Sequence, residues 1–214
     1  MEEINKFEKI AEENANLARI ERDTASEMKS LAKQSVKRAK AREMLARNEL
    51  EVAKVRERLA DKSKKLVERK EKMKDYLKIG EDILKAERIQ TQYNQNVAEI
   101  QTEIAEIQKE IAKIEKDITE IKVKIANKKL DEAKERGNLA NKIRDYVKLM
   151  NANAPSDKIS RAEEAYLNVQ KLLTKLETDA LELNKNIVKK QNKLADLKKD
   201  HSDKLAEREK IRPN

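Results

Sequence analysis

Apolar residues recur alternately three and four positions apart along most of the chain. The plainest run lies in the middle of the chain, where every apolar position after the first is isoleucine. Its members are Val97, Ile100, Ile104, Ile107, Ile111, Ile114, Ile118, Ile121 and Ile125. A strict seven-residue repeat predicts a helix that supercoils left-handedly with its neighbours. Isoleucine at both core positions favours assemblies of more than two helices, so we expect this run to make packing and oligomer contacts.

The last part of the chain carries the same apolar spacing. Its positions are Ala162, Tyr166, Val169, Leu173, Leu176, Ala180, Leu183, Ile187, Leu194 and Leu197. Two polar residues, Lys190 and His201, occupy core positions of this run. We expect Lys190 to extend its charged end to solvent or to fix the helix register. We interpret His201 as a tolerated polar residue near a helix end, with a pH-sensitive switch as the alternative.

The first part of the chain has a different pattern, in which alanine recurs every seven residues. This alanine ladder comprises Ala11, Ala18, Ala25, Ala32, Ala39, Ala46, Ala53 and Ala60. One position earlier in each heptad, a mostly apolar row runs from Ile10 to Met73. A small residue in every heptad lets another helix approach closely, so the ladder predicts the contact line of an antiparallel neighbour. The packing residues that we expect within it are Ala32, Ala39, Ala46 and Ala53.

Two breaks divide the helical pattern. At the first, Lys78 precedes Gly80 and two acidic residues follow, which is the charge order expected where one helix ends and another begins. At the second, Asn and Pro end a helix, and Ser156 and Asp157 can cap the next one. The predicted helices therefore cover about 3–78, 81–150 and 157–211.

These elements predict an all-α fold, an elongated antiparallel coiled coil of three long helices. We expect residues 1–150 to form a long helical hairpin that turns near Gly80. Residues 151–157 would form an Asn/Pro loop, and residues 158–214 would form the third coiled-coil helix. The alternative is one continuous rod over residues 3–150. We favour the hairpin because its two arms would be nearly equal in length.

The composition excludes several classes of protein. The 214 residues include 2 Gly, 2 Pro, no Cys and 1 His, with 43% charged and 2% aromatic residues. Compact α/β or all-β folds need tight turns and large core side chains, which are scarce here. The composition also excludes a disulfide, a thiolate zinc site, a cysteine nucleophile and a multi-histidine metal site. We therefore expect a non-enzymatic protein with no metal and no cofactor.

The location of the protein is predicted from what its sequence lacks. No run of 18 apolar residues occurs, which argues against a transmembrane helix. The first residues lack the basic and apolar regions of a signal peptide. We expect a cytoplasmic protein that lies at the inner face of a membrane.

The positive charge is concentrated in one stretch. Residues 29–78 carry 18 basic and 8 acidic groups, a net charge of +10, against +9 for the whole chain. A basic helical stretch indicates an anionic partner, and we favour an anionic membrane surface. The alternatives are a solvated face or a stripe that pairs with acidic stripes of neighbouring copies. The candidate anion-binding residues are Lys54, Arg56, Arg58, Lys62, Lys64, Lys65, Arg69, Lys70, Lys72 and Lys74.

Nucleic acid is the less favoured anionic partner. Proteins that bind single strands stack bases on aromatic side chains, and Tyr76 is the only aromatic residue near the basic stretch. Contacts to a duplex backbone need only charge and stay open as an alternative.

Two segments resemble the phage-shock protein A family, bacterial relatives of ESCRT-III. The first contains Phe7, Ile10 and Asn14-Ala15-Asn16, which are similar to that family's amphipathic opening helix. The second follows Pro155 and comprises Ser156, Lys158, Ile159, Ala162, Tyr166, Val169, Leu173, Leu176, Glu177 and Ala180. The resemblance implies a peripheral membrane protein that polymerises into curved scaffolds. BAR-type domains also combine three long helices with a basic face, an analogy of architecture alone.

The function predicted from the sequence is that of a non-enzymatic, self-assembling coiled-coil scaffold. We expect it to bind or remodel a membrane as a peripheral protein, contacting anionic lipid through the basic stretch. The alternative is a soluble coiled-coil filament, spacer or adaptor that has no membrane contact. The expected partners are further copies of the chain, an anionic membrane surface and other coiled-coil proteins.

Overall fold

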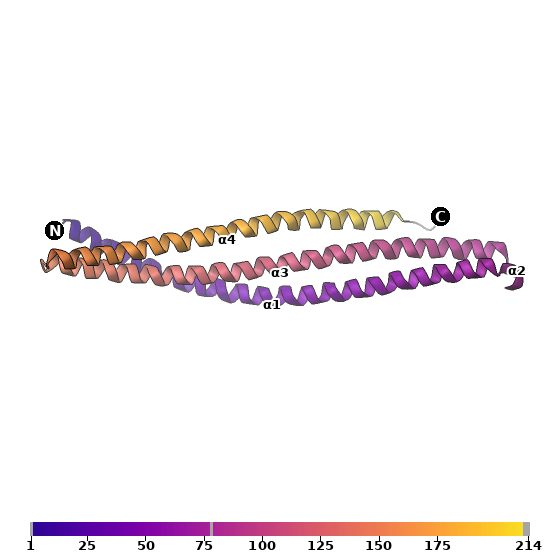
Figure 1. Ribbon diagram of the computed structural model, residues 1–214, viewed down its shortest axis with the longest axis horizontal. Coiled ribbons are helices and arrows are strands. Elements are labelled where there is room, and N and C mark those ends of the chain that lie inside the picture. Colours follow the sequence, from indigo (N-terminus) through magenta and orange to yellow (C-terminus); the bar gives the residue numbers. More distant parts are fainter. Residues whose placement is uncertain (1, 78, 212–214) are drawn as a thin grey trace. The chain divides into compact units, whose positions relative to one another are not determined.

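The described part of the protein is helical nearly throughout. A computed structural model describes residues 2–77 and 79–211, with side chains from residue 4 onward. The helices are α1 (Glu2–Lys72), α2 (Lys74–Leu77), α3 (Glu81–Asn151) and α4 (Ser156–Lys210) (Figure 1). No strand occurs among these residues, and the predicted all-α class is confirmed.

The connection between α1 and α3 differs from the expected one. The sequence predicts a first helix that runs to residue 78, but α1 ends at Lys72 and the four-residue α2 follows. The amide of Met73 donates to the carbonyl of Lys70 at 3.1 Å, a tightened turn that ends α1. The carbonyl of Gly80 then accepts hydrogen bonds from Ile83 and Leu84 in the first turn of α3. Lys78 lies outside the described residues.

The connection between α3 and α4 is a helix C-cap followed by proline. Asn153 has a φ of 46°, a left-handed conformation that asparagine tolerates better than most residues. The amide of Asn153 donates to Met150, and that of Ala154 donates to Leu149. These two bonds form a Schellman motif that satisfies the last carbonyls of α3. Both helix ends at this loop differ by one residue from the predicted ones, which is within the usual uncertainty of helix boundaries.

The helices contribute to two compact units. The first contains α1 as far as Val36 together with Ile118–Lys189. The second contains Lys37–Asp117 together with α4 from Lys190. Each unit therefore includes a segment of α1, of α3 and of α4.

In the first unit, small residues of α1 and α3 form the core. The buried residues of α1 are Ala11, Ala18, Ala25 and Ala32. The small buried residues of α3 are Ala126, Ala133, Ala140 and Val147, beside the larger Ile118, Ile125, Leu139, Ile143 and Tyr146. Ala11 and Val147 belong to one core cluster. A Cβ on Gly137 would lie 3.7 Å from the Cβ of Ala18, so the two backbones approach closely here. Near the helix ends, the ring of Tyr146 packs edge-on against Phe7 and Tyr166, at 5.4 Å from each.

In the second unit, a corresponding arrangement is built around Ala53 and Ala105. These two alanines form a core cluster with Leu50. Extending the register of this pair by seven residues in each direction places Ala46 opposite Ala112 and Ala60 opposite Ala98. All four of these alanines are buried. Glu43 pairs with Lys116 whereas Lys70, further along α1, pairs with the earlier Glu87 of α3, so α1 and α3 run in opposite directions within this unit. Ala39 is also buried in this unit.

The isoleucine run of α3 is covered within a single chain. Ile100, Ile104, Ile114, Ile118 and Ile125 are buried, and Ile107, Ile111 and Ile121 are half-buried. In the first unit, Ile125 of this run and Ile187 of α4 are both buried and line one groove. Much of the run is therefore buried within a single chain.

Candidate functional site

The ten basic side chains predicted to bind anions lie in α1 and α2, within the second unit. Six are exposed, namely Arg56, Arg58, Lys62, Lys65, Arg69 and Lys72. The other four, Lys54, Lys64, Lys70 and Lys74, are half-buried. The exposed six are the part of the predicted site that a partner could reach.

Two of the half-buried lysines form ion pairs with α3. The Nζ of Lys70 lies 2.7 Å from an oxygen of Glu87, and that of Lys74 lies 2.8 Å from an oxygen of Glu81. The hydrogen bond between Lys74 and Glu81 raises the pKa of the lysine and lowers that of the glutamate. Among residues 4–77 and 79–211, the other eight bases form no ion pair, so the chain leaves their charge available.

Lys64 differs from its neighbours because it lies in the row of α1 that borders α3. It follows Glu57 by seven residues, and Glu57 accepts a hydrogen bond of 2.8 Å from Thr102 of α3. Residues seven apart in a coiled coil share one face. The sequence grouped Lys64, Lys65 and Lys70 together as anion-binding residues; in the structure Lys70 is held in an ion pair with Glu87 of α3, and Lys64 is half-buried.

An exposed row of apolar side chains runs along α1 in the second unit. Its members, Leu45, Val52, Leu59, Leu66 and Met73, are 48–59% exposed. Each lies one residue before a position that packs on α3, so it points about 100° away from that interface. A row of this length on a surface is a candidate contact for a partner, since single exposed apolar residues are common but aligned ones are not.

The side chains that flank this row are basic or apolar. On an α-helix, the nearest flanking rows lie three and four residues away. From Val52 to Leu77, neither the central row nor its two flanking rows contains a carboxylate. We call this surface the basic–apolar face; it comprises Val52, Val55, Arg56, Leu59, Lys62, Ser63, Leu66, Arg69, Lys70, Met73, Tyr76 and Leu77.

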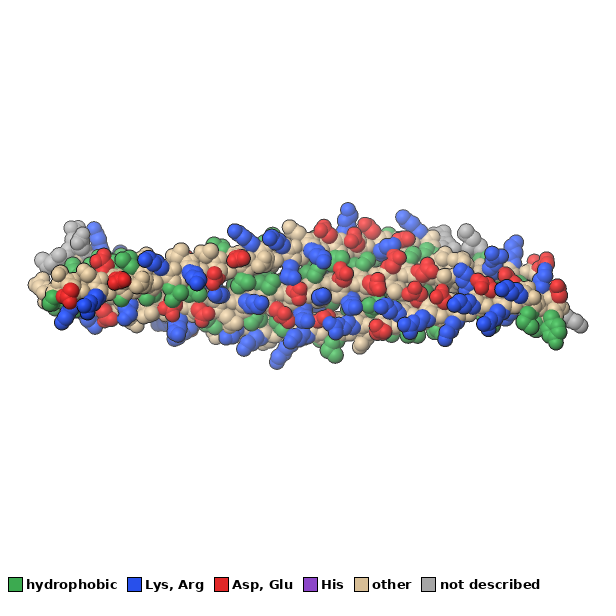
Figure 2. Space-filling view, in the orientation of Figure 1, with side chains coloured by type: hydrophobic (Ala, Val, Ile, Leu, Met, Phe, Trp, Pro, Cys, Tyr) green, Lys and Arg blue, Asp and Glu red, His purple; other side chains and the backbone are tan. Residues whose placement is uncertain are grey.

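The basic–apolar face ends in a group of apolar residues at α2. Tyr76 is 84% exposed there, the largest value among the exposed hydrophobic residues of the described chain. Figure 2 shows basic side chains along the edge formed by α1 and apolar ones gathered where α2 lies. Beyond the face, Arg58, Lys65 and Lys72 form a further row of exposed bases at seven-residue spacing. We call these three residues the outer basic row.

Two kinds of feature are absent from the part of the chain that the structure describes. Within residues 2–77 and 79–211, no three His, Cys, Asp or Glu side chains are grouped so that they could hold a metal ion. In the same residues, no helix has both the length and the apolar character needed to cross a bilayer.

Glu43 is a buried acid at the contact of α1 and α3 in the second unit. Only 9% of its side chain is exposed, and it lies 3.0 Å from Lys116 and 2.6 Å from Arg47. The hydrogen bond from Lys116, followed by that from Arg47, holds the pKa of Glu43 below its ordinary value of 4.5. This interaction therefore stabilises the fold above pH 4.5 and is lost as pH falls toward the lowered pKa.

We expect Glu43→Gln to lower the free energy of unfolding by about 1.5–3 kcal/mol at pH 7, the range for a hydrogen bond to a charged group. The difference from the parent protein should shrink as the pH falls below 4.5, because the parent then loses the same charge. Urea unfolding followed by circular dichroism at pH 7 and pH 3 measures both values. Equal stability of the two proteins at pH 7 would contradict the assignment.

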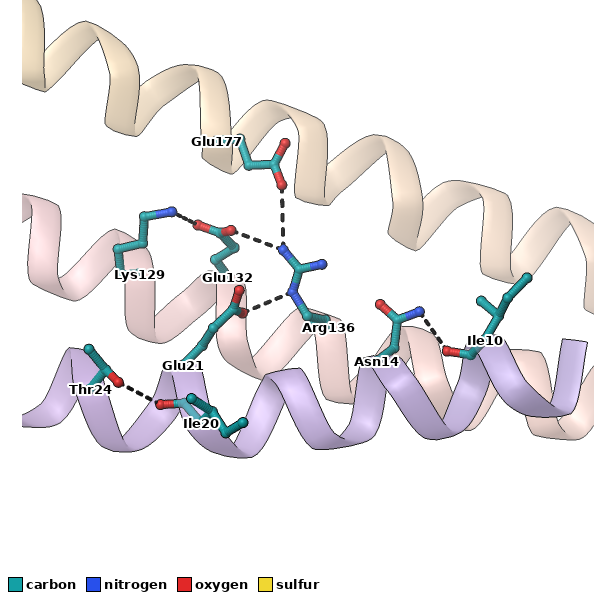
Figure 3. A network of polar contacts seen from close by, with 9 residues as sticks. All are labelled: Ile10, Asn14, Ile20, Glu21, Thr24, Lys129, Glu132, Arg136 and Glu177. Atoms are coloured by element: carbon teal, nitrogen blue, oxygen red, sulfur yellow. Dashed lines mark hydrogen bonds and ion pairs between the residues drawn. The ribbon is translucent and has the colours of Figure 1, made fainter.

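Arg136 is the centre of a polar network in the first unit that the sequence analysis does not identify (Figure 3). Its Nε lies 2.9 Å from Glu21 of α1, and its terminal nitrogen lies 3.2 Å from Glu132 and 3.5 Å from Glu177 of α4. Lys129 approaches Glu132 at 2.6 Å. The Glu132 side chain is only 4% exposed. The network joins all three helices, and we interpret it as structural because its charges already have partners.

Comparison with known proteins adds no assignment to these surfaces. No family model matches the chain, and no curated protein matches it. The function must therefore be inferred from the residues and their arrangement.

Proposed function

We propose that the protein is a non-enzymatic coiled-coil scaffold that assembles with itself and contacts an anionic membrane surface through α1. The observation that carries this proposal is the set of six exposed bases between Arg56 and Lys72, none of which forms an ion pair among residues 4–77 and 79–211. Lysines and arginines near an anionic bilayer contribute about 1 kcal/mol each.

The outer basic row suits such a membrane contact. Its three bases would contribute at most about 3 kcal/mol per copy, because the exposed Asp61 and Glu68 lie three or four residues from them on the helix. This is below the 4.1 kcal/mol of a millimolar affinity. A single copy would then bind weakly, whereas several linked copies would bind firmly because each contact raises the effective concentration of the next. Self-assembly and membrane binding are therefore coupled in this proposal.

We further propose that the whole chain forms an elongated antiparallel coiled coil, with a hairpin of α1 and α3 and with α4 as the third helix. In the first unit, Ala11 shares a core cluster with Val147. In the second unit, Ala53 shares one with Ala105. Both pairs of residue numbers add to 158, and a common register in both units supports one hairpin over a continuous rod. The resemblance of the N-terminal and post-Pro155 segments to the phage-shock protein A family supports a location at the inner membrane face.

Reversing the outer basic row tests the membrane contact. We expect Arg58→Glu/Lys65→Glu/Lys72→Glu to abolish cosedimentation with vesicles that contain anionic lipid, because attraction becomes repulsion. Helicity should be nearly unchanged, since glutamate is a good helix former at exposed positions. Sedimentation at 0.1 M NaCl and circular dichroism measure the two effects.

The matched control reverses three exposed lysines of α4, as Lys171→Glu/Lys185→Glu/Lys189→Glu, which changes the net charge equally. This control should bind vesicles like the parent. If both variants lose binding equally, total charge rather than the outer basic row governs the contact. If the parent ignores anionic vesicles at low salt, the soluble filament, spacer or adaptor takes the place of the membrane scaffold.

A further inference from the structure

A second exposed apolar row lies on α1 in the first unit. Its large members are Ile10, Leu17 and Leu31, which are 42%, 45% and 63% exposed. Two further apolar residues of the flanking rows, Ile20 and Met28, are 58% and 46% exposed. The row occupies the same heptad position as the apolar row of the second unit, one residue before each alanine of the ladder.

The charges beside this second row have the opposite sign. From Ile10 to Ser35, the central row and its two flanking rows contain three acids and no base. Glu13 and Glu27 are exposed, and Glu21 is held by Arg136. We call this surface the acidic–apolar face; it comprises Ile10, Glu13, Asn14, Leu17, Ile20, Glu21, Thr24, Glu27, Met28, Leu31, Gln34 and Ser35.

The acidic–apolar face is bordered by two grooves that could receive side chains of a partner. One, of about 500 Å³, is lined by Ile10 and Asn14 of α1 and by Leu167 of α4, among others. The other, of about 450 Å³, is lined by Met28 and Leu31 and by residues of α3 and α4. Apolar side chains set seven residues apart on a helix are suited to enter such grooves as knobs.

We propose that the basic–apolar face of one copy docks on the acidic–apolar face of a second copy of this chain. The inference specifies the interface of the self-assembly that the proposed function requires. The acidic–apolar face spans 26 residues of α1, or about 39 Å of helix. The basic–apolar face spans 21 residues of α1, or about 32 Å, and continues into α2. Apolar residues recur every seven positions in both rows. Arg56, Lys62 and Arg69 would then lie against carboxylates such as those of Glu13 and Glu27. Charges of opposite sign fix which faces meet and disfavour contact between like faces.

The interface joins two different faces. A pair of copies therefore either docks both pairs of faces reciprocally or retains one free face of each kind, to which further copies can add. The outer basic row lies beside the docking face rather than within it, which leaves these three bases for the membrane.

A mixing experiment tests the docking of opposite faces. The first variant, Arg56→Glu/Lys62→Glu/Arg69→Glu, makes both faces acidic. The second variant, Glu13→Lys/Glu27→Lys, makes both faces basic. Mass photometry and analytical ultracentrifugation of each protein, without vesicles, measure the assembly. We expect the parent to form dimers and larger species, and each variant alone to need at least about tenfold more protein to do so.

The mixture of the two variants should assemble again, because every acidic face then finds a basic face on the other variant. Neither variant removes a core residue, and circular dichroism should show parental helicity for both. The proposal is overturned if the parent is a 24.8 kDa monomer at tens of micromolar. It is also overturned if the variants assemble like the parent, or if the mixture fails to assemble although both variants are folded.

A matched experiment separates this interface from insertion of the basic–apolar face into lipid. The chain contains no tryptophan, so Leu66→Trp supplies one reporter on that face, and Leu181→Trp supplies one on an exposed position of α4. We expect the fluorescence of Trp at 66 to shift to the blue on assembly in solution, and that of Trp at 181 to stay unchanged. Quenching of Trp at 66 only by vesicles with brominated lipid, with no shift in their absence, would assign the face to lipid instead and overturn the proposal.

The outcomes distinguish this inference from the proposed membrane contact. If the inference fails, the assembly measured without vesicles is unaffected by reversal of the docking charges. If only the membrane contact fails, the outer-row variant and the parent assemble equally, and neither sediments with anionic vesicles.

Discussion

Arg136→Leu is expected to lower the free energy of unfolding by about 3 kcal/mol. Removing one partner of a buried ion pair costs about 3–5 kcal/mol because it leaves a buried charge without compensation. Glu132, with 4% of its side chain exposed, would retain only Lys129, so we expect the low end of that range. The partly exposed Glu21 and Glu177 would also lose their shared partner. Urea unfolding followed by circular dichroism measures the difference.

A second substitution should recover much of this loss. In the Arg136→Leu background, Glu132→Gln removes the unbalanced negative charge, so the double variant should be more stable than Arg136→Leu alone. A double-mutant cycle over the two sites gives their interaction energy. Arg22→Leu, at an exposed position of α1 with no ion pair among the described residues, serves as the control. Equal stability of the Arg136 and Arg22 variants would show that the network does not hold the first unit together.

Ala126→Leu is expected to destabilise the protein by about 1–3 kcal/mol, the usual cost of overpacking a core. Ala126 has no exposed surface, and the register of the first unit places it opposite the buried Ala32. A leucine there would push α1 away from α3. Thermal unfolding followed by circular dichroism should show a melting temperature lower by roughly 2–4 °C per kcal/mol for a chain of this size.

The control for this prediction is Ala195→Leu, at an exposed position of α4. Leucine is nearly as good a helix former as alanine, so this change should leave the melting temperature close to that of the parent. An Ala126 variant that melts together with the Ala195 variant would rule out close packing between the small residues of α1 and α3.

The helix ends were predictable to different degrees because their signals differ in strength. Asn153 and Pro155 carry a strong local signal, since one adopts the left-handed conformation and the other cannot continue a helix. The end of α1 at Lys72 carries no such signal, because Glu71, Lys72 and Met73 are all good helix formers. α1 ends there at the turn that connects it to α3, although no residue near Lys72 would by itself end a helix.

The packing of α3 could have been predicted more fully than it was. The packing predicted for α3 rested on the isoleucine run, but a second ladder of small residues lies beside it. Its members, all buried, are Ala98, Ala105, Ala112, Ala126, Ala133 and Ala140. This spacing is visible in the sequence and matches the ladder of α1. The packing of the two alanine ladders against each other could therefore have been predicted.

Other features depend on three-dimensional packing and carry no sequence signal of their own. The row from Leu45 to Met73 has the spacing of a core seam, yet it stays exposed because the ladder beside it already packs on α3. Lys64 and Lys65 are the same residue type, and only the directions in which they project from the helix distinguish them. Glu132 is buried beside Arg136. Its place in the sequence, next to Ala133 of the ladder, does not by itself predict that a charged residue is buried.

Cosedimentation of the parent protein with vesicles is the measurement that tests the membrane scaffold most directly. We expect the protein to sediment with anionic vesicles at 0.1 M NaCl and not to sediment with neutral ones. We also expect a steep loss of binding at 1 M NaCl, because the Debye length falls from about 10 Å at 0.1 M to about 3 Å at 1 M. Equal sedimentation with anionic and neutral vesicles, or none with either at 0.1 M NaCl, would contradict it.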